Sequence, residues 1–338
     1  MPGAHAPRLR IGYFGDGPWA NRALQYIAED PRMEVAFVTP RHGRPDAGLR
    51  AWAIRLGVPF ISDPNVNSRA FLDRTKACAP DIFVSMSFDQ IVKRPFIDET
   101  QYGAINCHAG ALPFYRGRNP LNWALINGEG NFGITVHYID EGIDTGDIIV
   151  QRFSPISPSD TYADLLARAH GLCANTLVEA LGLIYEGEAP RIRQSDLSSQ
   201  HTYFSSRRLG DEWIDWKWPS QRIFNFIRAI TVPGPCARSL IGERRIAIVE
   251  ASMAPSVPAH IGSNGEVVGR SASGNLVKTG DTGILVTKIA DILPDDSLDA
   301  VVVPCFPIGT RFGNSLFADV MVLRQRVADL ERKLGGTQ

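Results

Sequence analysis

The sequence predicts an α/β fold in its first half and a smaller, β-rich domain after it. Short apolar runs typical of strands alternate with helix-like stretches up to about residue 200. Such alternation is typical of βαβ units around a mostly parallel sheet. Beyond residue 205, short strand-like runs are separated by Gly-rich turns. With 338 residues, 44% of them hydrophobic, the chain can form two domains with substantial cores.

Three strands and two helices are expected before residue 100, because apolar residues keep the spacing of each element there. The strands are 11–14, 34–39 and 81–86, and the helices are about 19–29 and 49–56. In a sheet of this kind, ligands bind beyond the carboxyl ends of the strands.

The second part of this domain contains a strand-like run at 102–108 and two more at 135–139 and 147–151. The last two flank the acidic turn Asp140-Glu141-Gly142-Ile143-Asp144-Thr145-Gly146-Asp147. A helix is expected over about 160–186, with Ser159 or Asp160 as its N-cap and a broad apolar stripe.

A polar stretch rich in Ser and Arg, 194–206, indicates a domain boundary. The expected divisions are 1–200, 205–315 and a C-terminal helix over 316–338. The second domain should hold one helix near 221–230 and a small β-barrel. Its strands are expected at 245–250, 265–269, 275–278 and 283–289, with the turn Gly280-Asp281-Thr282-Gly283 before the last of them.

Charge and cysteine content exclude several classes of protein. The formal net charge is −1, so no strong field attracts nucleic acid or an anionic membrane. The five cysteines are scattered and form no Cys-x-x-Cys pair, which argues against a metal cluster or a disulfide framework. The first residues contain no signal-peptide pattern, and no apolar run is long enough to span a bilayer. We therefore expect a cytoplasmic protein without a metal.

The triplet Asn106-Cys107-His108 and the following acidic turn bring together an amide, an imidazole and a carboxylate. These groups can move a proton and stabilise an oxyanion without a covalent intermediate. Alternate residues of a strand share a face, so Asn106 and His108 should point together and Cys107 away from them. A Cys107–His108 nucleophilic pair is therefore disfavoured, and Cys107 should be a small core residue.

Two motifs suggest other functions. Gly15-x-Gly17-x-x-Ala20 formally matches a dinucleotide-binding fingerprint, but Pro18 follows the second Gly. The second strand ends at Thr39 and Arg41 rather than at an acid, so a turn that caps the first helix, and that could also contact an anionic substrate, is the better interpretation. An NADP role stays open only because Arg41 could meet a 2′-phosphate. Asp-Thr-Gly occurs at 144–146 and again at 281–283, as in a two-lobed aspartic protease. The two copies lie in dissimilar surroundings, and the second is most simply a turn.

A C-terminal heptad pattern suggests self-association. Apolar residues recur at alternating steps of three and four: Val320, Leu323, Val327, Leu330 and Leu334. About two heptads are too few to hold a dimer alone, so a helix against the chain's own body is the alternative. The pattern nevertheless predicts a homodimer in which this helix takes part.

The chain resembles the 10-formyltetrahydrofolate-dependent formyltransferases over nearly its whole length. The resemblance rests on Asn106-x-His108, Leu112-Pro-x-Tyr-Arg-Gly-Arg-Asn-Pro120, Trp123-Ala124, Gly133-x-Thr-x-His137 and Asp140-x-Gly-x-Asp-Thr-Gly146. Ile214-Asp215-Trp216, Ile227-Arg228-Ala229-Ile230 and Pro233-Gly-Pro235 extend it into the second domain. It implies a Rossmann-like catalytic domain and a C-terminal OB-like β-barrel domain.

The resemblance also implies roles for matching residues. Asn106 would stabilise the oxyanion, His108 would be the general acid/base, and Asp144 would hold and tune His108. Phe88, Gln90 and Ile91 match a segment that meets the pterin ring, and the formyl-folate site would also include Arg118, Asp140, Glu141, Gly142 and Ile143.

The acceptor is expected to be a nucleotide-linked amino sugar, not a nucleic acid. From Ser205 onward the chain has 16 Lys and Arg against 14 Asp and Glu, a balance of +2, whereas a tRNA-binding relative should be basic. The segments 12–19 and 86–91 also look more like sugar N-formyltransferases. Gly15, Asp16, Gly17 and Trp19 would contact the nucleotide sugar. Methionyl-tRNA and hydroxyornithine formylation stay open as alternatives, with an aspartic protease as a remote one.

Overall fold

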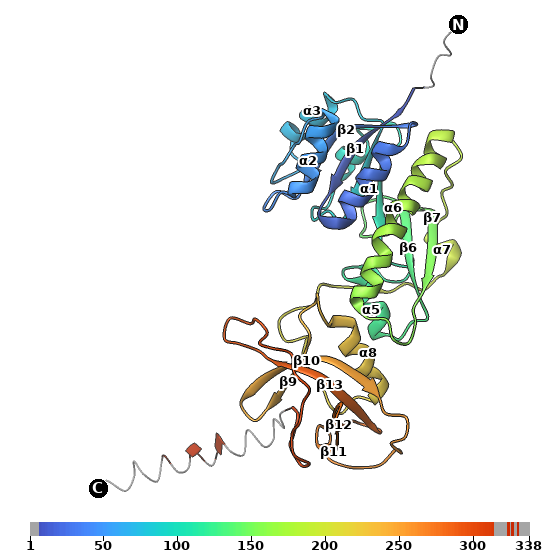
Figure 1. Cartoon of the computed structure of the whole chain (residues 1–338). Coiled ribbons are helices and arrows are strands. Elements are labelled where there is room, and N and C mark those ends of the chain that lie inside the picture. The colour runs from blue at the N-terminus through green and yellow to red at the C-terminus, as the bar shows by residue number, and fades with distance from the viewer. Residues whose placement is uncertain (1–6, 314–322, 325, 328–329, 331–338) are drawn as a thin grey trace. The chain divides into compact units, whose positions relative to one another are not determined.

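The computed structural model describes residues 7–313 together with 323, 324, 326, 327 and 330. The chain divides into two compact units (Figure 1). The first contains Met1–Ala124, Glu129–Asp160 and Asp164–Ser206; the second contains Leu125–Gly128, Thr161–Ala163 and Arg207–Gln338. Most of the helix predicted over 316–338 lies outside the described residues.

A six-stranded sheet forms the centre of the first unit, in the order β2-β1-β3-β4-β6-β7. Its strands are β1 (Leu9–Gly15), β2 (Met33–Pro40), β3 (Ile82–Met86), β4 (Ala104–His108), β6 (Asn131–Tyr138) and β7 (Ile148–Pro155). The first four strands pair in parallel, but the β4–β6 and β6–β7 pairs are antiparallel. The sheet is therefore mixed, and the predicted mostly parallel sheet is correct only for β1 to β4.

The change of direction follows from the connection after β4. A parallel strand requires a crossover that returns the chain to the end of the sheet at which the previous strand begins. Between β4 and β6 the chain forms only the two-residue strand β5 (Arg116–Gly117) and the short helix α5 (Pro120–Ile126). Strand β6 therefore begins at the end of the sheet where β4 finishes, and His108 of β4 pairs with Thr135 of β6 there.

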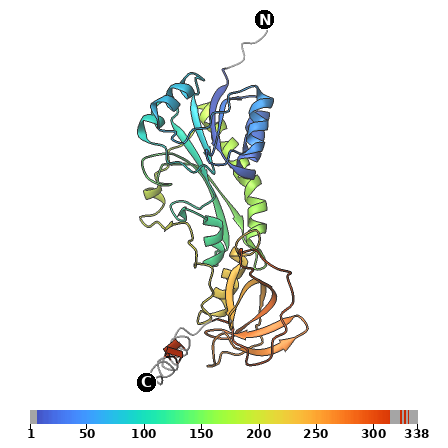
Figure 2. The same ribbon diagram turned by 90° about the vertical axis from the view of Figure 1, so that its left-hand side faces the viewer.

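Helices lie on both sides of this sheet (Figure 2). They are α1 (Gly17–Glu29), α2 (Ala47–Leu56), α3 (Arg69–Lys76), α4 (Arg94–Ile97), α6 (Tyr162–Glu186) and α7 (Gln194–Leu197). Alternate side chains of β1 point to opposite faces of the sheet and show which helices cover each face. Tyr13 donates to the Ala20 carbonyl in α1, whereas Phe14 points to the other face and contacts Phe71 of α3 and Phe96 of α4.

The face of α3 and α4 holds an aromatic core. Phe14 lies against Phe37, Phe83 and Phe96, with ring centroids 5.3–5.6 Å apart. Each of these side chains is at most 2% exposed. Ala104, the first residue of β4, belongs to the same cluster, and strand alternation places Asn106 and His108 on the same face of the sheet. Burying an aromatic ring of this size contributes about 1.5–3 kcal/mol.

The second unit contains a five-stranded antiparallel sheet in the order β11-β12-β13-β10-β9. The strands are β9 (Ala237–Ile241), β10 (Arg244–Met253), β11 (Val267–Ser271), β12 (Gly274–Lys278) and β13 (Gly283–Asp291). Helix α8 (Ser220–Ile230) buries Ile223, Phe226, Ile227 and Ile230, as predicted. Within the described residues the sheet is open, with β11 and β9 at its edges, and does not show the predicted barrel.

Strand β9 was not predicted, because its alternation is not apolar against polar. Arg238 and Ser239 are both buried there. The Arg238 guanidinium is paired with Asp296 at 3.0 Å, and Ser239 accepts a hydrogen bond from the Trp216 indole. Partners distant in the sequence therefore make these polar residues suitable for a strand interior.

The second Asp-Thr-Gly sequence is a turn that holds a helix start. The Asp281 carboxylate accepts hydrogen bonds from the Ser220 and Thr282 amides, 2.8 and 2.7 Å away, and from the Thr279 hydroxyl. Burial opposes ionisation, but these bonds outweigh it and lower the pKa of Asp281 to about 2. Asp281 therefore accepts a hydrogen bond from the first residue of α8. The prediction that the second Asp-Thr-Gly sequence is a turn is confirmed.

Candidate active site

The end of β4 presents the two polar side chains that the strand pattern paired. Asn106 and His108 point to the face away from α6, whereas the Cys107 thiol lies 3.7 Å from the Cys173 carbonyl in α6. Cys107 is 6% exposed. The prediction that Cys107 is a core residue, unable to pair with His108, is confirmed.

His108 has a different protein group beside each of its ring nitrogens. Its Nε2 lies 2.7 Å from the Tyr115 carbonyl, which can only accept a hydrogen bond, so Nε2 carries the proton. The lone pair of the neutral ring is then on Nδ1, which faces the Asp144 carboxylate at 3.7 Å. Tyr115 has a φ of 59°, a left-handed conformation that is uncommon for a bulky residue. The site therefore fixes the tautomer with Nδ1 as the proton acceptor.

A glycine makes this approach of imidazole and carbonyl sterically feasible. A Cβ at Gly110 would lie 2.5 Å from His108 Nε2 and 2.7 Å from the Tyr115 oxygen. Gly110 also accepts a hydrogen bond from the buried Thr135 hydroxyl, 2.7 Å away. The loop after β4 therefore has no room for a larger residue at 110.

Asp144 closes the site from the loop after β6. Its carboxylate accepts a 2.8 Å hydrogen bond from the Gly117 amide and lies 3.5 Å from His137 Nε2. Burial raises the pKa of Asp144, but His108, His137 and the Gly117 amide together hold it well below its usual range. Asp144 is therefore ionised whenever the protein is folded near neutral pH.

Burial dominates the pKa of His108 and lowers it from the ordinary value. Asp144 and the Tyr115 carbonyl raise that pKa, and His137 lowers it further. Asp144 thus raises the pKa of His108, as a neighbouring carboxylate should, but burial lowers that pKa by more. The ring is consequently neutral near pH 7 and able to take up a proton.

His137 is a further member of the site to which the sequence assigned no role. Its Nδ1 donates to the Tyr138 carbonyl at 2.7 Å, and its Nε2 lies 3.3 Å from the side-chain nitrogen of Asn106. The Asn106 amide also reaches Asp144 at 3.4 Å. Both contacts are long, so Asn106 can turn an N–H toward an oxyanion without losing a strong hydrogen bond.

Gln194 is a second residue that sequence reasoning missed, because its segment looks like a polar linker. Its side chain is only 4% exposed and contacts the backbone on both sides of Thr145, at the carbonyls of Asp144 and Gly146. A buried Gln within a Ser- and Arg-rich stretch has no local signal, since its partners lie about 50 residues away.

The residues predicted to meet the pterin lie in the segment after β3. Phe88 contacts Phe14 of the aromatic core, with ring centroids 5.5 Å apart, and Ile91 is 63% exposed. The Gln90 side chain bonds to the Val66 amide and the Asp63 carbonyl, so it holds the backbone of this segment in place.

Arg118, the other residue predicted at the folate site, follows β5. It is exposed, and its amide donates to the Phe204 carbonyl at 2.8 Å. The backbone of this residue is therefore fixed while its guanidinium faces solvent.

The loop that carries Asp140, Glu141, Gly142 and Ile143 is stabilised from within. Asp140 accepts hydrogen bonds from the Gly142 amide at 3.0 Å and the Thr145 hydroxyl at 2.5 Å. Glu141, Gly142 and Ile143 are exposed at its tip. The prearranged backbone of this loop can therefore offer its polar groups to a ligand.

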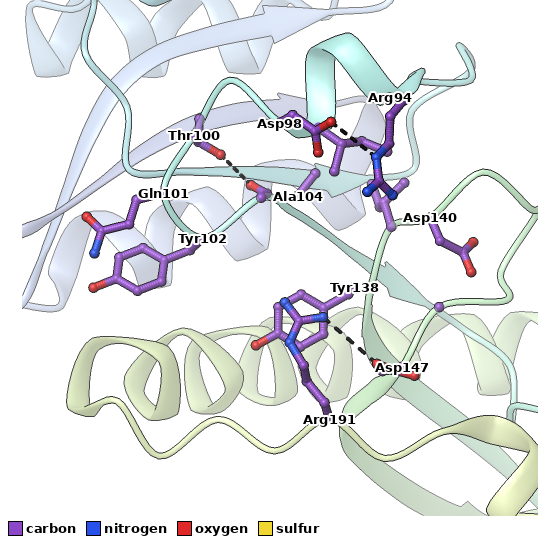
Figure 3. Close-up of a pocket in the computed structure, with 14 residues that line it drawn as sticks. Arg94, Asp98, Thr100, Gln101, Tyr102, Ala104, Tyr138, Asp140, Asp147 and Arg191 are labelled. Atoms are coloured by element: carbon purple, nitrogen blue, oxygen red, sulfur yellow. Dashed lines mark hydrogen bonds and ion pairs between the residues drawn. The ribbon is translucent and has the colours of Figure 1, made fainter.

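A cavity of about 420 Å³ adjoins this loop (Figure 3). Ile97, Ala104 and Ile139 form part of its wall, and Asp140 and Gly146 connect it to the loop. On another side the Arg191 guanidinium lies 3.7 Å from the centre of the Tyr138 ring, and Asp147 is 3.9 Å from Arg191. The lining therefore combines an apolar wall with hydrogen-bonding groups.

The turn of Gly15, Asp16, Gly17 and Trp19 has partners within the protein. The Gly17 amide at the start of α1 donates to the Asp46 carboxylate at 3.2 Å. Asp16 forms an ion pair with Arg41 at 3.3 Å, and Trp19 contacts His170, with ring centroids 4.5 Å apart.

Arg41 is also bound to the Ser87 carbonyl, 2.6 Å away. A phosphate at the α1 terminus would meet the Asp16 and Asp46 carboxylates, and Arg41 is engaged by protein groups. These contacts count against the dinucleotide interpretation.

Comparison with known proteins decides the family of this chain. Residues 10–181 match the family described as "Formyl transferase", and residues 208–292 match "Formyl transferase, C-terminal domain". The chain belongs to the formyl transferase family. It is an N-formyltransferase, and the resemblance noted in the sequence is confirmed.

Curated relatives in this family include two methionyl-tRNA formyltransferases that match along most of their length. The enzyme of Syntrophus aciditrophicus is 35% identical over 289 residues, covering 83% of this chain and 90% of the relative. That of Geobacter sulfurreducens is 31% identical over 288 residues, covering 83% and 89%. The matched lengths are greater than the first unit alone, so the likeness extends into the second.

Solved structures of formyltransferases have the same fold. A sugar 3N-formyltransferase, WlaRD, determined with dTDP and 5-N-formyl-THF, has a TM-score of 0.63 at 24% identity, covering 83% of this chain and 98% of that one. An N-formyltransferase from Helicobacter canadensis, in complex with folinic acid and dTDP-3-aminofucose, has a TM-score of 0.61 at 22% identity, covering 83% and 99%. At these identities the likeness concerns the fold alone.

Two further features bear on the site and its setting. In the part of the chain that the structure describes, no cluster of three or more His, Cys, Asp or Glu side chains has an arrangement suited to a metal ion. None of the helices in that part combines the length and the hydropathy needed to cross a bilayer.

Proposed function

We propose that this formyltransferase transfers a formyl group from 10-formyltetrahydrofolate to the amino group of a nucleotide-linked amino sugar. The observation that carries the chemistry is the arrangement of Asn106, His108 and Asp144 around one point at the end of β4. An amide donor, a neutral imidazole and an ionised carboxylate are what direct attack of an amine on a formyl carbon requires.

Proton transfer falls to His108. The attacking amine must lose a proton, and His108 Nδ1 has the free lone pair because the Tyr115 carbonyl holds the other nitrogen. The imidazolium that results is stabilised by the Asp144 carboxylate and by the same carbonyl. It can return the proton to the folate nitrogen as the bond between that nitrogen and the formyl carbon breaks. A positioned acid/base of this kind contributes typically about 10²–10⁴-fold in rate.

Charge stabilisation falls to Asn106. Negative charge develops on the formyl oxygen during attack, and an N–H of the Asn106 amide can donate to it. Loss of one such donor typically costs about 10²–10³ in rate. His137 and Asp144 keep the amide oriented through the long contacts described above.

The residues present suit a formyl-folate donor, which supplies an activated formyl group. Ile91 and Ile143 offer exposed apolar side chains on the two segments near the site, and the Asp140 loop offers backbone polar groups. The neighbouring cavity adds the apolar wall of Ile97, Ala104 and Ile139. We assign the pterin end of the donor to this region, with Phe88, Gln90, Ile91 and residues 140–143 as its lining and Arg118 near its entrance.

The charges of the second unit support a sugar acceptor. Several of its cations are neutralised in ion pairs, including Arg244 with Asp291, Lys288 with Glu250 and Arg311 with Glu266. Arg238 and Arg245 share Asp296. A polyanion binds mainly by contacts between its phosphates and Lys or Arg side chains, so paired cations weaken that mode. Nucleotide sugars carry only a diphosphate and need few cations.

Methionyl-tRNA is the second candidate, because curated methionyl-tRNA formyltransferases are 31% and 35% identical to this chain. Incubation with 10-formyltetrahydrofolate and a panel of UDP-, dTDP- and GDP-amino sugars or initiator methionyl-tRNA separates the two. We expect turnover with one class of nucleotide sugar and only a shallow salt dependence. Preference for the tRNA, with a rate that falls steeply with salt, would overturn the sugar proposal and leave formyl transfer intact.

Substitutions test the catalytic roles separately from the acceptor. We expect Asn106→Ala, His108→Ala and Asp144→Ala each to lower kcat by at least about 10²-fold, because each removes a group that acts in the transition state. Circular dichroism and thermal melting check that the fold is kept. Near-normal formylation by a folded variant would refute the role of that residue.

A further inference from the structure

Gln194 lies at the start of the polar segment 194–206, which leads to the second unit, yet both N–H groups of its side-chain amide are engaged at the active-site loop. Its Nε2 donates to the Asp144 carbonyl at 2.8 Å and to the Gly146 carbonyl at 2.9 Å. The two donor hydrogens of the amide are thus used on the backbone of a single turn. That turn contains Asp144 itself.

The acceptor side of the same amide reaches a different segment. Gln194 Oε1 accepts hydrogen bonds from Arg116, at 3.1 Å from Nε and 2.6 Å from Nη2. Arg116 belongs to β5, and the next residue, Gly117, donates its amide to the Asp144 carboxylate at 2.8 Å. Gln194, Arg116–Gly117 and Asp144 therefore form a closed ring of hydrogen bonds.

This ring of hydrogen bonds stabilises an unusual backbone conformation in the turn that contains Asp144. Asp144 has a φ of 55°, in the left-handed region, and such residues persist where the surrounding structure over-determines them. Gly146, two residues later, allows the Tyr138 carbonyl to approach, since a Cβ at this position would lie 1.9 Å from that oxygen. Both the backbone and the carboxylate of the Asp144 turn are therefore fixed by specific partners.

We propose that Gln194, the first residue of the polar segment 194–206, is a positioning residue that holds the Asp144 carboxylate in place opposite His108. The proposal rests on the proposed function only for its kinetic consequence. Gln194 itself is placed behind the Asp144 backbone and is not assigned a contact with substrate. A misplacement of about 1 Å in a catalytic group can cost roughly 10²-fold in rate.

The first test is Gln194→Leu, which keeps the approximate volume and removes all four hydrogen bonds. We expect kcat to fall about 10²-fold while the KM for the amine acceptor changes little. Gln200→Leu is the matched control, because Gln200 lies in the same segment with an exposed side chain. The control should keep the wild-type kcat.

Gln194→Glu separates the two halves of the ring. A carboxylate still accepts from Arg116 but cannot donate to the Asp144 and Gly146 carbonyls. We expect it to lose kcat to a similar extent as the Leu variant. Wild-type kcat in the Glu variant would overturn the proposal, and this variant decides the matter if the Leu variant does not fold.

A titration of the His108 imidazole by NMR, without substrate, supplies a readout that a general loss of stability would not move. The titratable groups that act on His108 are Asp144, which raises its pKa, and His137, which lowers it. If Gln194 positions Asp144, Gln194→Leu should shift the pKa of His108 in the same direction as Asp144→Asn does. A fall in kcat with no shift would overturn the proposal.

The same titration distinguishes failure of this proposal from failure of the proposed function. It needs no acceptor and no donor, so the shift is measured whether or not the protein formylates a sugar. Absence of formyl transfer in the wild type would refute the proposed function and leave the His108 measurement as the test of Gln194.

Discussion

At the residue scale, the two nitrogens of His108 have separate partners with separate effects. The Tyr115 carbonyl determines which nitrogen carries the proton, and Asp144 stabilises the charged ring after proton uptake. The first contact depends on Gly110, where no side chain fits. Catalytic competence thus depends on a residue that bears no functional group.

Gly110→Ala should lower kcat by about 10²-fold or more, because its Cβ would displace the His108 ring or the Tyr115 carbonyl. Gly130→Ala is the control, since a Cβ at Gly130 would meet no atom within 4 Å. Steady-state kinetics of both variants give the comparison. Equal activity of the two would mean that the contact between His108 and Tyr115 has no catalytic role.

The pH dependence of kcat/KM should follow the pKa of His108. Burial lowers this pKa, so the acidic limb of the profile should lie below the ordinary histidine value of about 6.5. Asp144 raises the same pKa, so Asp144→Asn should move the limb to lower pH on its reduced rate. A limb that moves to higher pH in this variant would contradict the assignment.

The sequence predicted which side chains of β4 meet but not what holds them. Strand alternation was enough to separate Cys107 from Asn106 and His108. The contacts of His108 with the Tyr115 carbonyl and of Asp144 with the Gly117 amide involve backbone groups, which carry no residue-type signal. Such partners can be identified only from the three-dimensional structure of the loops.

At the element scale, the two Asp-Thr-Gly turns show how one tripeptide serves two purposes. The Asp144 carboxylate faces two histidines, whereas the Asp281 carboxylate faces amides and hydroxyls at the start of α8. Each carboxylate is held by its own partners, and neither of these sets includes a second carboxylate. The shared dyad of an aspartic protease is thus not formed by these contacts.

Asp281→Ala should lower the free energy of unfolding by about 1–2 kcal/mol, because the start of α8 loses its acceptor. The folded pKa of about 2 lies below the ordinary value of 3.8. The stabilisation is therefore complete above about pH 4 and is lost as the pH falls through about 2.

Denaturant unfolding of Asp281→Ala, with Asp295→Ala as control, gives the measurement. Asp295 is exposed and accepts hydrogen bonds from nearby Ser297, so its loss should leave the free energy of unfolding close to that of the wild type. Formyl transfer should stay near the wild-type rate in Asp281→Ala. A large loss of kcat in a folded Asp281 variant would contradict a purely structural role.

The sequence predicted helices and strands correctly where hydrophobic residues are regularly spaced. It failed where the direction or the pairing of a strand depends on segments distant in the sequence. Strands β1, β2 and β3 and helix α8 lie within a few residues of the predicted ranges. The antiparallel direction of β6 could not be read locally, because it depends on which edge of the sheet the chain has reached. Strand β9 was missed because the partner of Arg238 lies 58 residues away.

At the scale of the whole molecule, the C-terminal heptad bears on self-association. Leu323, Val327 and Leu330 are helical and more than half exposed, whereas Val320 and Leu334 of the same pattern lie outside the described residues. Three exposed apolar side chains at heptad spacing provide one face that a second copy could cover. We keep the homodimer as a proposal.

Size-exclusion chromatography with light scattering on the full chain, and on a chain shortened to end at Phe317, tests the homodimer. We expect the full chain to have twice the monomer mass and the shortened chain to shift toward the monomer. An unchanged mass after shortening would show that residues beyond 317 do not hold the dimer.

The two-stranded pairing of β5 with β8 (Tyr203–Phe204) has a consequence for how this chain can be recombined with others. Arg116 and Arg118 donate their amides to the carbonyls of Thr202 and Phe204, and a Cβ at Gly117 would lie 2.2 Å from the latter oxygen. A chimaera joined upstream of Gln194 would replace the strand that supports the catalytic loop. The exchangeable cassette therefore begins after Phe204, and hybrids that respect this junction should inherit an intact reaction centre.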